Sequence, residues 1–249
     1  MMKILFYNIS KNTSLNFIII QKVKRYMLLL LVLAAVSCTD NQKKSNANGD
    51  SAFEKVAEEY IKGYLNWRPQ SGVSLGLHEY DGKLPDYSKA SIDEELKRLK
   101  YYDKMLSETD TASLSTNSYY DWKILRSGIK NEIFSFEDLK IYTKNPMTYA
   151  GAVDVNIYIK RNFAPIEQQI KSIIAIENKV PQFYENAKAN LQDTLAIPHI
   201  QLAIEIARGS ASFLENDLRV ALKEVKNESL MKEFTAANKK AIAAINDYA

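Results

Sequence analysis

The sequence is poor in the residues that build disulfides and metal sites. Its 249 residues include one cysteine, Cys38, and two histidines, His78 and His199. A single cysteine excludes an intrachain disulfide. A metallopeptidase helix needs two histidines four residues apart beside a glutamate, and the sequence that begins at His78-Glu79 has Gly82 in the place of the second histidine. We therefore expect no zinc site, no other metal site and no cofactor in this chain.

Acidic residues are absent from the first 37 positions, which hold five basic ones. The remainder has 28 basic and 30 acidic residues, a net charge of −2, so the formal charge of +3 comes from this leader. We therefore expect no nucleic-acid partner. Long apolar runs are lacking too. Met27 to Val36 has the length of a signal-peptide core and is too short to cross a bilayer.

Only Ser37 separates Cys38 from this apolar run. Ala35-Val36-Ser37-Cys38 resembles a bacterial lipobox, in which the cysteine is lipidated and becomes the mature N-terminus. Residues 1–37 are then a signal segment, with Met27 as an alternative start, and residues 38–50 are a lipidated cysteine and polar tether. This implies a lipid-anchored protein of the bacterial cell envelope, in the outer membrane or facing the periplasm, with the membrane as partner. A free thiol after an ordinary signal peptide is the alternative.

Apolar residues recur at helical spacing in most of the chain from Ser51 onward. Capping boxes at Ser51–Glu54 and Ser91–Glu94 predict two helix starts, and Met147 to Phe163 stays open between a short helix and an extended piece. No cluster of alternating strands is present. We predict an all-α fold, a multi-helix array of about seven amphipathic helices over residues 51–249. The expected helices run from Ser51 to before Pro69, Ser91 to Leu106, Trp122 to Phe136, Ile166 to Val180, Gln182 to Leu191, His199 to Val225, and from Ser229 onward.

The last predicted helix runs to Ala249 without a glycine cap, a following proline or a basic final turn. This favours a truncated C-terminus over a frayed natural end. Residues 51–249 are therefore expected to be the N-terminal part of a larger helical domain.

One long irregular segment, Trp67 to Ser88, interrupts the helical pattern. It holds three of the eight glycines and two of the six prolines, together with enough aromatic and apolar residues to predict an ordered, packed loop. Within it, Gly72-Val73-Ser74-Leu75-Gly76 matches the nucleophile elbow of serine hydrolases. That motif works at a strand-to-helix turn above a parallel sheet, which an all-α chain lacks. A serine hydrolase that uses Ser74 is therefore the least favoured hypothesis.

Two segments carry a family resemblance. Trp67-x-Pro69, followed by Leu75-Gly76-Leu77-His78-x-Tyr80-Asp81-x-x-Leu84-x-Asp86-x-Ser88, resembles the N-terminal signature of the bacterial family catalogued as domain of unknown function 885. A later segment resembles the middle region of the same family through Asn145-Pro146, Tyr149, Tyr158-Ile159, Arg161, Phe163-Ala164-Pro165, Glu167, Pro181 and Ala187-x-x-Asn190-Leu191. Members are often lipoproteins or secreted proteins about twice as long, similar to helical zinc metallopeptidases whose metal motif lies in the C-terminal half.

The resemblance implies that this chain is the N-terminal helical portion of an envelope-anchored, zinc-dependent peptidase-like lipoprotein. The chain lacks the metal motif and is expected to be inactive alone, with a peptide as substrate and zinc only in a full-length relative. The residues expected to line the substrate cleft are Trp67, His78, Tyr80, Asp81 and Asp86. Alternatively, these polar groups hydrogen-bond the loop itself while Trp67 packs it onto the helices. The alternative function is a non-enzymatic helical lipoprotein that binds a peptide or envelope partner through the Trp67–Ser88 loop.

Overall fold

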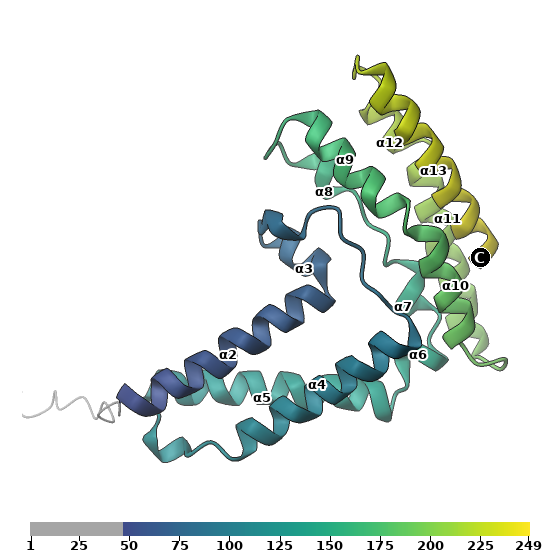
Figure 1. The fold of residues 1–249 in the computed structure, drawn as a ribbon. Coiled ribbons are helices and arrows are strands. Elements are labelled where there is room, and N and C mark those ends of the chain that lie inside the picture. Colours follow the sequence, from purple (N-terminus) through teal and green to yellow (C-terminus); the bar gives the residue numbers. More distant parts are fainter. Residues whose placement is uncertain (1–46) are drawn as a thin grey trace, which may run out of the picture. The chain divides into compact units, whose positions relative to one another are not determined.

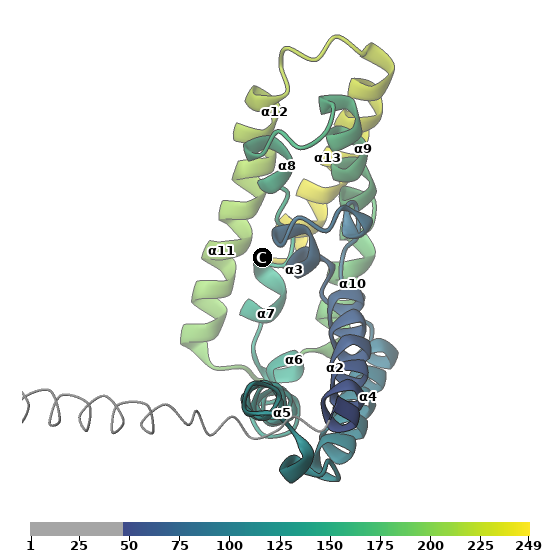
Figure 2. The same cartoon turned by 90° about the vertical axis from the view of Figure 1, so that its left-hand side faces the viewer.

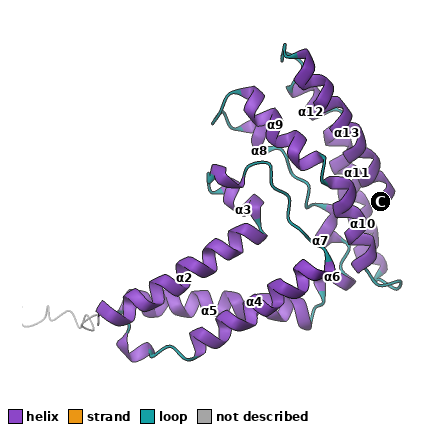
Figure 3. Ribbon diagram, viewed as in Figure 1, coloured by secondary structure: helices purple, strands orange, loops and turns teal. Residues whose placement is uncertain are grey.

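The structure is a computed structural model that describes residues 47–249 (Figure 1). This part of the chain is all-α and contains no strand (Figure 3), which confirms the predicted fold class. The predicted signal segment and Cys38 lie outside the described residues. The elements in chain order are α2 (Ala47–Trp67), α3 (Pro69–Ser74), η1 (His78–Tyr80), α4 (Lys89–Ser107), η2 (Thr111–Ser113), α5 (Thr116–Glu137), α6 (Ile141–Lys144), α7 (Met147–Ala150), α8 (Ile157–Lys160), α9 (Ile166–Glu177), α10 (Val180–Asn190), α11 (Ile197–Glu215), α12 (Asp217–Ala221) and α13 (Glu228–Tyr248).

The long helices lie where apolar periodicity predicts them. Among residues 47–249, the helices of 11 residues or more are α2, α4, α5, α9, α10, α11 and α13. Each overlaps one of the seven predicted stretches. The short helices α7 and α8 fall in the segment that the sequence leaves open, and the residues between them, which include buried Val153 and Val155, are not helical.

Helix α2 begins earlier than its predicted capping box. It starts at Ala47, so Ser51 lies inside the helix and the prediction of a helix start at Ser51 is wrong. The side chain of Asp50 accepts a hydrogen bond from the backbone N–H of Ser115, 65 residues away. This tertiary contact holds the first turn of α2 in place, and no local pattern indicates it.

The second predicted capping box is displaced as well. Helix α4 starts at Lys89, and the hydroxyl of Ser88 accepts the backbone N–H of Ser91 at 3.3 Å. Ser91 is therefore the recipient of the cap and not the cap itself. The prediction placed the N-cap three residues too late.

The segment from Trp67 to Ser88 is less irregular than predicted. Arg68 leaves the helical region (φ −119°, ψ 67°), as expected of a residue before proline, and ends α2. Pro69 then occupies the first turn of α3, where its fixed φ suits a helix and its missing N–H costs nothing. The expectation of a wholly irregular loop is therefore wrong, because α3 and η1 form within it.

The predicted helix from His199 to Val225 is divided in two. Helix α11 ends at Glu215 and α12 begins at Asp217. At the junction the side-chain amide of Asn216 donates to the carbonyl of Ser212 at 3.0 Å. Such local side-chain bonds compete with the helical ladder and favour a break.

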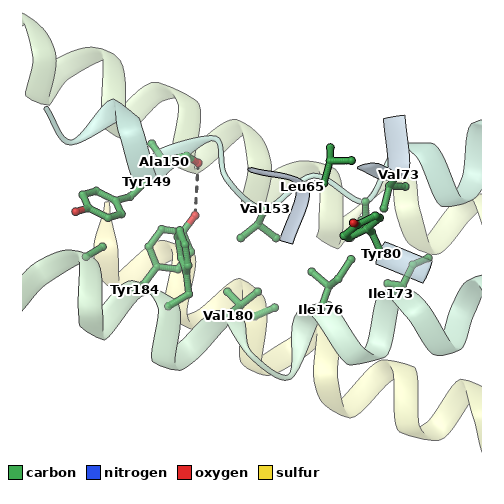
Figure 4. Packing of buried hydrophobic residues seen from close by; sticks show 14 of the residues in the cluster. Leu65, Val73, Tyr80, Tyr149, Ala150, Val153, Ile173, Ile176, Val180 and Tyr184 are labelled. Carbon is green, nitrogen blue, oxygen red and sulfur yellow. Dashed lines mark hydrogen bonds between the residues drawn. The ribbon is translucent and has the colours of Figure 1, made fainter. Parts of the chain in front are cut away.

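The long helices form two groups. Helices α2, α4 and α5 pack against one another, and α9, α10, α11 and α13 form a second group (Figures 1 and 2). A close-up of the core shows Leu65, Val73 and Tyr80 from the α2–η1 region lying beside Ile173 and Ile176 of α9 (Figure 4). In the same view the hydroxyl of Tyr184 donates to the carbonyl of Ala150 at 3.4 Å.

An aromatic cluster joins the two groups of helices. Its rings meet in pairs with centroids 4.8–6.4 Å apart, a range typical of edge-to-face and tilted aromatic contacts. Large buried aromatic rings dominate the energetics of such a core. The cluster consists of Trp67, Tyr87, Phe136, Tyr142, Tyr149 and Phe183.

No helix within residues 47–249 combines the length and apolarity needed to cross a bilayer.

Candidate functional site

The two segments that carry the family resemblance lie against each other in the fold. The backbone N–H of Gly82 donates to the hydroxyl of Tyr158 at 3.0 Å, across 76 residues of sequence. The imidazole of His78 stacks on Phe163 with 4.3 Å between centroids and 21° between ring planes. These contacts hold the η1 region against the α8 region.

Two further hydrogen bonds join α3 to the same later segment. Arg161 donates from Nη1 to the carbonyl of Ser74 at 3.2 Å, and the side-chain amide of Gln70 donates to the carbonyl of Ala152. Residues far apart in the chain therefore share one site. Its two main walls come from the Trp67–Ser88 segment and from residues 150–163, and Tyr64, Leu65 and Ile176 complete its lining.

A pocket of about 570 Å³ opens between these walls. We call it the α3 pocket. Its volume lies in the range of pockets that bury a small organic ligand. Its lining combines apolar and polar side chains: Tyr64, Leu65, Gln70, Ser71, Val73, Ser74, Leu75, Gly151, Asp154, Ile157, Tyr158 and Ile176.

His78 and Asp81 form a side-chain pair. Nδ1 of His78 lies 3.1 Å from Oδ2 of Asp81, whose side chain is 11% exposed, while that of His78 is 48% exposed. A carboxylate on Nδ1 favours the tautomer that carries its proton there and leaves Nε2 as an acceptor. The two residues are brought together, and their shared bond lies within the loop.

Tyr158 is the buried hydroxyl beside this pair. Burial raises the pKa of Tyr158 to about 12; the hydrogen bond from Gly82 opposes the rise and the nearby carboxylate of Asp81 adds to it. The phenol is therefore protonated at neutral pH. It accepts the N–H of Gly82 and retains its own proton for donation.

Gly82 is required where the loop meets α9. Its φ is +71°, a left-handed value that favours glycine, and an added Cβ would lie 3.2 Å from Cβ of Ala175 and 3.3 Å from Cα of Ser172. A side chain at this position would therefore combine a strained backbone with a tight contact against α9.

The other predicted cleft residues have mainly structural surroundings. Trp67 belongs to the aromatic cluster and donates from Nε1 to the hydroxyl of Ser91 at 3.1 Å. The ring of Tyr80 is 5% exposed and lies so close to Gly72 that an added Cβ there would meet Cδ2 at 2.4 Å. None of these side chains lines the α3 pocket.

Asp86 serves the backbone of the loop. Its Oδ1 accepts the backbone N–H of Ser88 at 2.8 Å, a local turn bond of the kind that aspartate commonly makes. This hydrogen bond is the kind expected from the alternative interpretation, in which the polar side chains of the loop hydrogen-bond the loop itself.

Ser74 is the last residue of α3 and does not lie at a strand-to-helix turn. Its hydroxyl donates to the carbonyl of Gln70 at 2.8 Å. The nearest imidazole in sequence, that of His78, is paired through Nδ1 with Asp81. The surroundings that a nucleophile elbow requires are not found around Ser74 in the described part of the chain.

No group of three or more histidine, cysteine, aspartate or glutamate side chains within residues 47–249 is arranged to hold a metal ion. The sequence gives no individual role to Asp154, which lines the pocket, or to Arg161, which donates a hydrogen bond to the lining residue Ser74. Arg161 stands in the later resembling segment, which is the signal that identifies it. Asp154 lies between the quoted positions of that segment and has no signal of its own.

The comparisons with known proteins agree with this arrangement of the chain. A solved structure described as "a putative lipoprotein of unknown function from Shewanella oneidensis" superposes with a TM-score of 0.70 at 22% sequence identity. The match covers 79% of this chain and 36% of that one, so the chain spans little more than a third of that protein's length. At this identity the likeness shows the fold alone.

The search of curated proteins finds no match. The family model described as "Bacterial protein of unknown function (DUF885)" matches residues 69–249, a range that includes both resembling segments except Trp67 and Arg68 and continues to the last residue. The chain therefore belongs to the bacterial family of unknown function DUF885.

Proposed function

We propose that this chain is the N-terminal helical portion of an envelope-anchored, zinc-dependent peptidase-like lipoprotein, and that the α3 pocket forms part of its substrate cleft. One observation carries the proposal. The two segments that resemble the family, separated by about 60 residues of helix, meet in space and line one pocket. A pocket with apolar walls and a few fixed polar groups is the usual form of a small-ligand site.

The side chains of this portion do not fit a zinc site. A catalytic zinc ion needs three protein ligands, and the described residues offer no group of three suitable side chains. Nδ1 of His78 is already paired with Asp81. In this proposal the zinc ligands belong to a further part of a longer protein, and residues 47–249 are inactive alone. The length of the Shewanella oneidensis chain, only 36% of which is matched, leaves room for such ligands.

The lipid anchor is the second part of the proposal. The lipobox-like residues before Cys38 support it, together with the description of the similar structure as a lipoprotein. Labelling cells with a radioactive fatty acid tests it directly. The wild-type protein should carry the label and enter the detergent phase, and Cys38→Ser should abolish both. A label that persists in the variant would place the lipid elsewhere.

The peptidase proposal is tested by comparing two proteins. This chain and the longest protein encoded by the same gene are each assayed for bound zinc and for hydrolysis of a peptide library. We expect no zinc and no turnover in this chain, and zinc with chelator-sensitive turnover in the longer protein. Stoichiometric zinc and chelator-sensitive turnover in this chain alone would overturn the proposal.

A non-enzymatic peptide-binding module is the second candidate. It is favoured by the fact that residues of this chain form a pocket of about 570 Å³ without the further part of a longer protein. Peptide binding by this chain, combined with no hydrolysis by the longest encoded protein, would select this function over the peptidase.

A further inference from the structure

We propose that the α3 pocket binds a short zwitterionic peptide: an apolar side chain enters the pocket, the terminal carboxylate pairs with Arg161, and the terminal ammonium pairs with Asp154. This inference deepens the proposed function, because it names the substrate class of the same site.

The floor of the α3 pocket selects an apolar side chain. Leu65, Val73 and Ile176 line it and are 1–7% exposed, so they form a preformed apolar surface. Leu75 also lines the pocket, yet its side chain is 72% exposed. An exposed leucine that lines an apolar pocket is positioned to close over a bound side chain, and covering it adds apolar burial to the binding energy.

Arg161 supplies a cation beside the pocket. Its Nη1 donates to the carbonyl of Ser74, a residue that lines the pocket. A guanidinium has five N–H donors, so this bond orients the group and leaves others for a ligand. Arginine pairs with carboxylates through two parallel hydrogen bonds, which makes a peptide carboxylate the matching ligand.

Asp154 supplies the opposite charge. Its Oδ1 accepts the backbone N–H and the side-chain amide of Asn156 at 2.8 and 2.9 Å, which fixes the carboxylate in a turn. Both bonds reach the same oxygen, so Oδ2 keeps its acceptor capacity for an ammonium or amide N–H.

The number of residues between the two charges suits a short peptide. Asp154 precedes α8 and Arg161 follows it. The four residues of this helix rise about 6 Å, and Val155 and Asn156 also lie between the two charges. A peptide spans about 3.3–3.6 Å per residue, so the two ends of a dipeptide or tripeptide are roughly 7–11 Å apart. Longer chains would reach only one of the two charges with a terminus.

The test uses calorimetric titration of the full chain, in detergent, with trileucine in three forms: unmodified, amidated at the C-terminus and acetylated at the N-terminus. We expect each modification to weaken binding by at least about tenfold, as the loss of a charge-assisted hydrogen bond does. In Arg161→Gln the unmodified peptide should bind about as weakly as the amide, and the difference between these two forms should vanish. In Asp154→Asn the difference between the unmodified and acetylated forms should vanish.

Matched variants separate these effects from general ones. Arg208→Gln removes an exposed arginine on α11. Asp110→Asn alters an exposed aspartate that, like Asp154, accepts the backbone N–H two residues on. Neither should change the affinity for any form. Leu75→Ser should weaken all three forms by a similar factor of about three, because it removes apolar contact without touching charge.

Two results would overturn the inference: no binding of any form at millimolar peptide, or a preference for the free carboxylate that persists in Arg161→Gln. Other results distinguish a failure of this binding mode from a failure of the proposed peptidase function. If the longest encoded protein hydrolyses peptides while Arg161→Gln leaves its KM unchanged, the peptide-binding mode is wrong and the peptidase stands. If trileucine binds as described and no form of the protein hydrolyses it, the peptidase is wrong and the binding mode stands.

Discussion

Each of the two groups of helices buries a glutamate, but one glutamate is paired with arginines and the other is not. Glu95 in the α2–α4–α5 group is 3% exposed, and Glu177 in the α9–α13 group is 0% exposed. Glu95 accepts hydrogen bonds from Nε and Nη2 of Arg98 at 2.7 and 2.8 Å and lies 3.7 Å from Nη1 of Arg68. Glu177 accepts one bond, at 2.8 Å from the side-chain amide of Asn238, and its Oε2 has no protein partner among the described residues.

The difference shows that burial alone does not decide the charge of a carboxyl group. Burial raises the pKa of Glu177 to about 8, and the hydrogen bond from Asn238 only partly opposes the rise. No cation contacts this carboxyl in the described part of the chain, so it is buried as a neutral acid. Around Glu95 two arginines compensate the cost of burial, and Arg68 also pairs with Glu132.

The charged network also fixes the end of α2. Burial lowers the pKa of Arg68, but the attraction of Glu132 and nearby tyrosines outweighs it and leaves the pKa raised. The guanidinium lies over the rings of Tyr64 and Trp67 at 4.7 and 4.8 Å. The point where proline ends α2 is therefore also where charge and aromatic contacts tie three helices together.

Among the substitutions compared, Glu177→Gln should change the free energy of unfolding most, and the change should depend on pH. A carboxyl whose pKa is higher in the folded than in the unfolded state favours folding while it is protonated. That advantage is lost as pH rises from the unfolded value near 4.5 to about 8. Glutamine does not ionise. We expect the free energy of unfolding of the variant, relative to wild type, to rise by about 4 kcal/mol between pH 5 and pH 8. Urea unfolding at a series of pH values measures it.

The matched control for this experiment is Glu233→Gln, which changes an exposed glutamate on α13. Its free energy of unfolding should track that of wild type at every pH. A flat difference between Glu177→Gln and wild type would mean that Glu177 keeps its solvent-like pKa, and the contrast between the two glutamates would then disappear.

Glu95→Gln should lower the free energy of unfolding at neutral pH. Removing this charge leaves Arg98 and Arg68 partly buried without their shared carboxylate. Breaking a buried ion pair from one side costs about 3 kcal/mol. Replacing a buried glutamate with glutamine should thus stabilise the α9–α13 group above neutral pH and destabilise the α2–α4–α5 group. Urea unfolding at pH 7 measures the loss, and Glu94→Gln, at an exposed neighbour, should change stability by less than about 0.5 kcal/mol. Equal effects of the two variants would refute the role of the network.

Periodicity was sufficient to predict the long helices, but not the points where they begin. Each long helix buries a stripe that repeats every three or four residues, and this signal is local. The start of α2 depends on the bond between Asp50 and Ser115, which are 65 residues apart. Helix α3 was missed because six residues are too few to show a stripe. Its only local mark, Pro69, signals the end of one helix and the beginning of the next equally well.

The site was predictable only in part for the same reason. The resemblance drew attention to His78 and Asp81, and the structure pairs them. The contact between Arg161 and Ser74 spans 87 residues and leaves no pattern in either segment. Glu177, by contrast, had a visible signal. It stands four residues after Ile173 and three before Val180, on the buried stripe of its region, where an acidic residue is out of place.

Lys100→Ala should give the smallest effect and sharpen the comparison further. Lys100 pairs with Glu137 between α4 and α5, in the same helix group as Glu95, but the two side chains are 53% and 43% exposed. Water screens such a pair, so its removal should cost less than about 0.5 kcal/mol. Lys104→Ala, at another exposed lysine of α4, is the control, and urea unfolding at low and high salt is the measurement. If burial determines how much an ion pair stabilises the fold, the free energies of unfolding of the two lysine variants should agree within error at both salt concentrations. A salt-sensitive loss above about 1 kcal/mol for Lys100→Ala alone would show instead that pairing across α4 and α5 stabilises this group even where the charges remain in water.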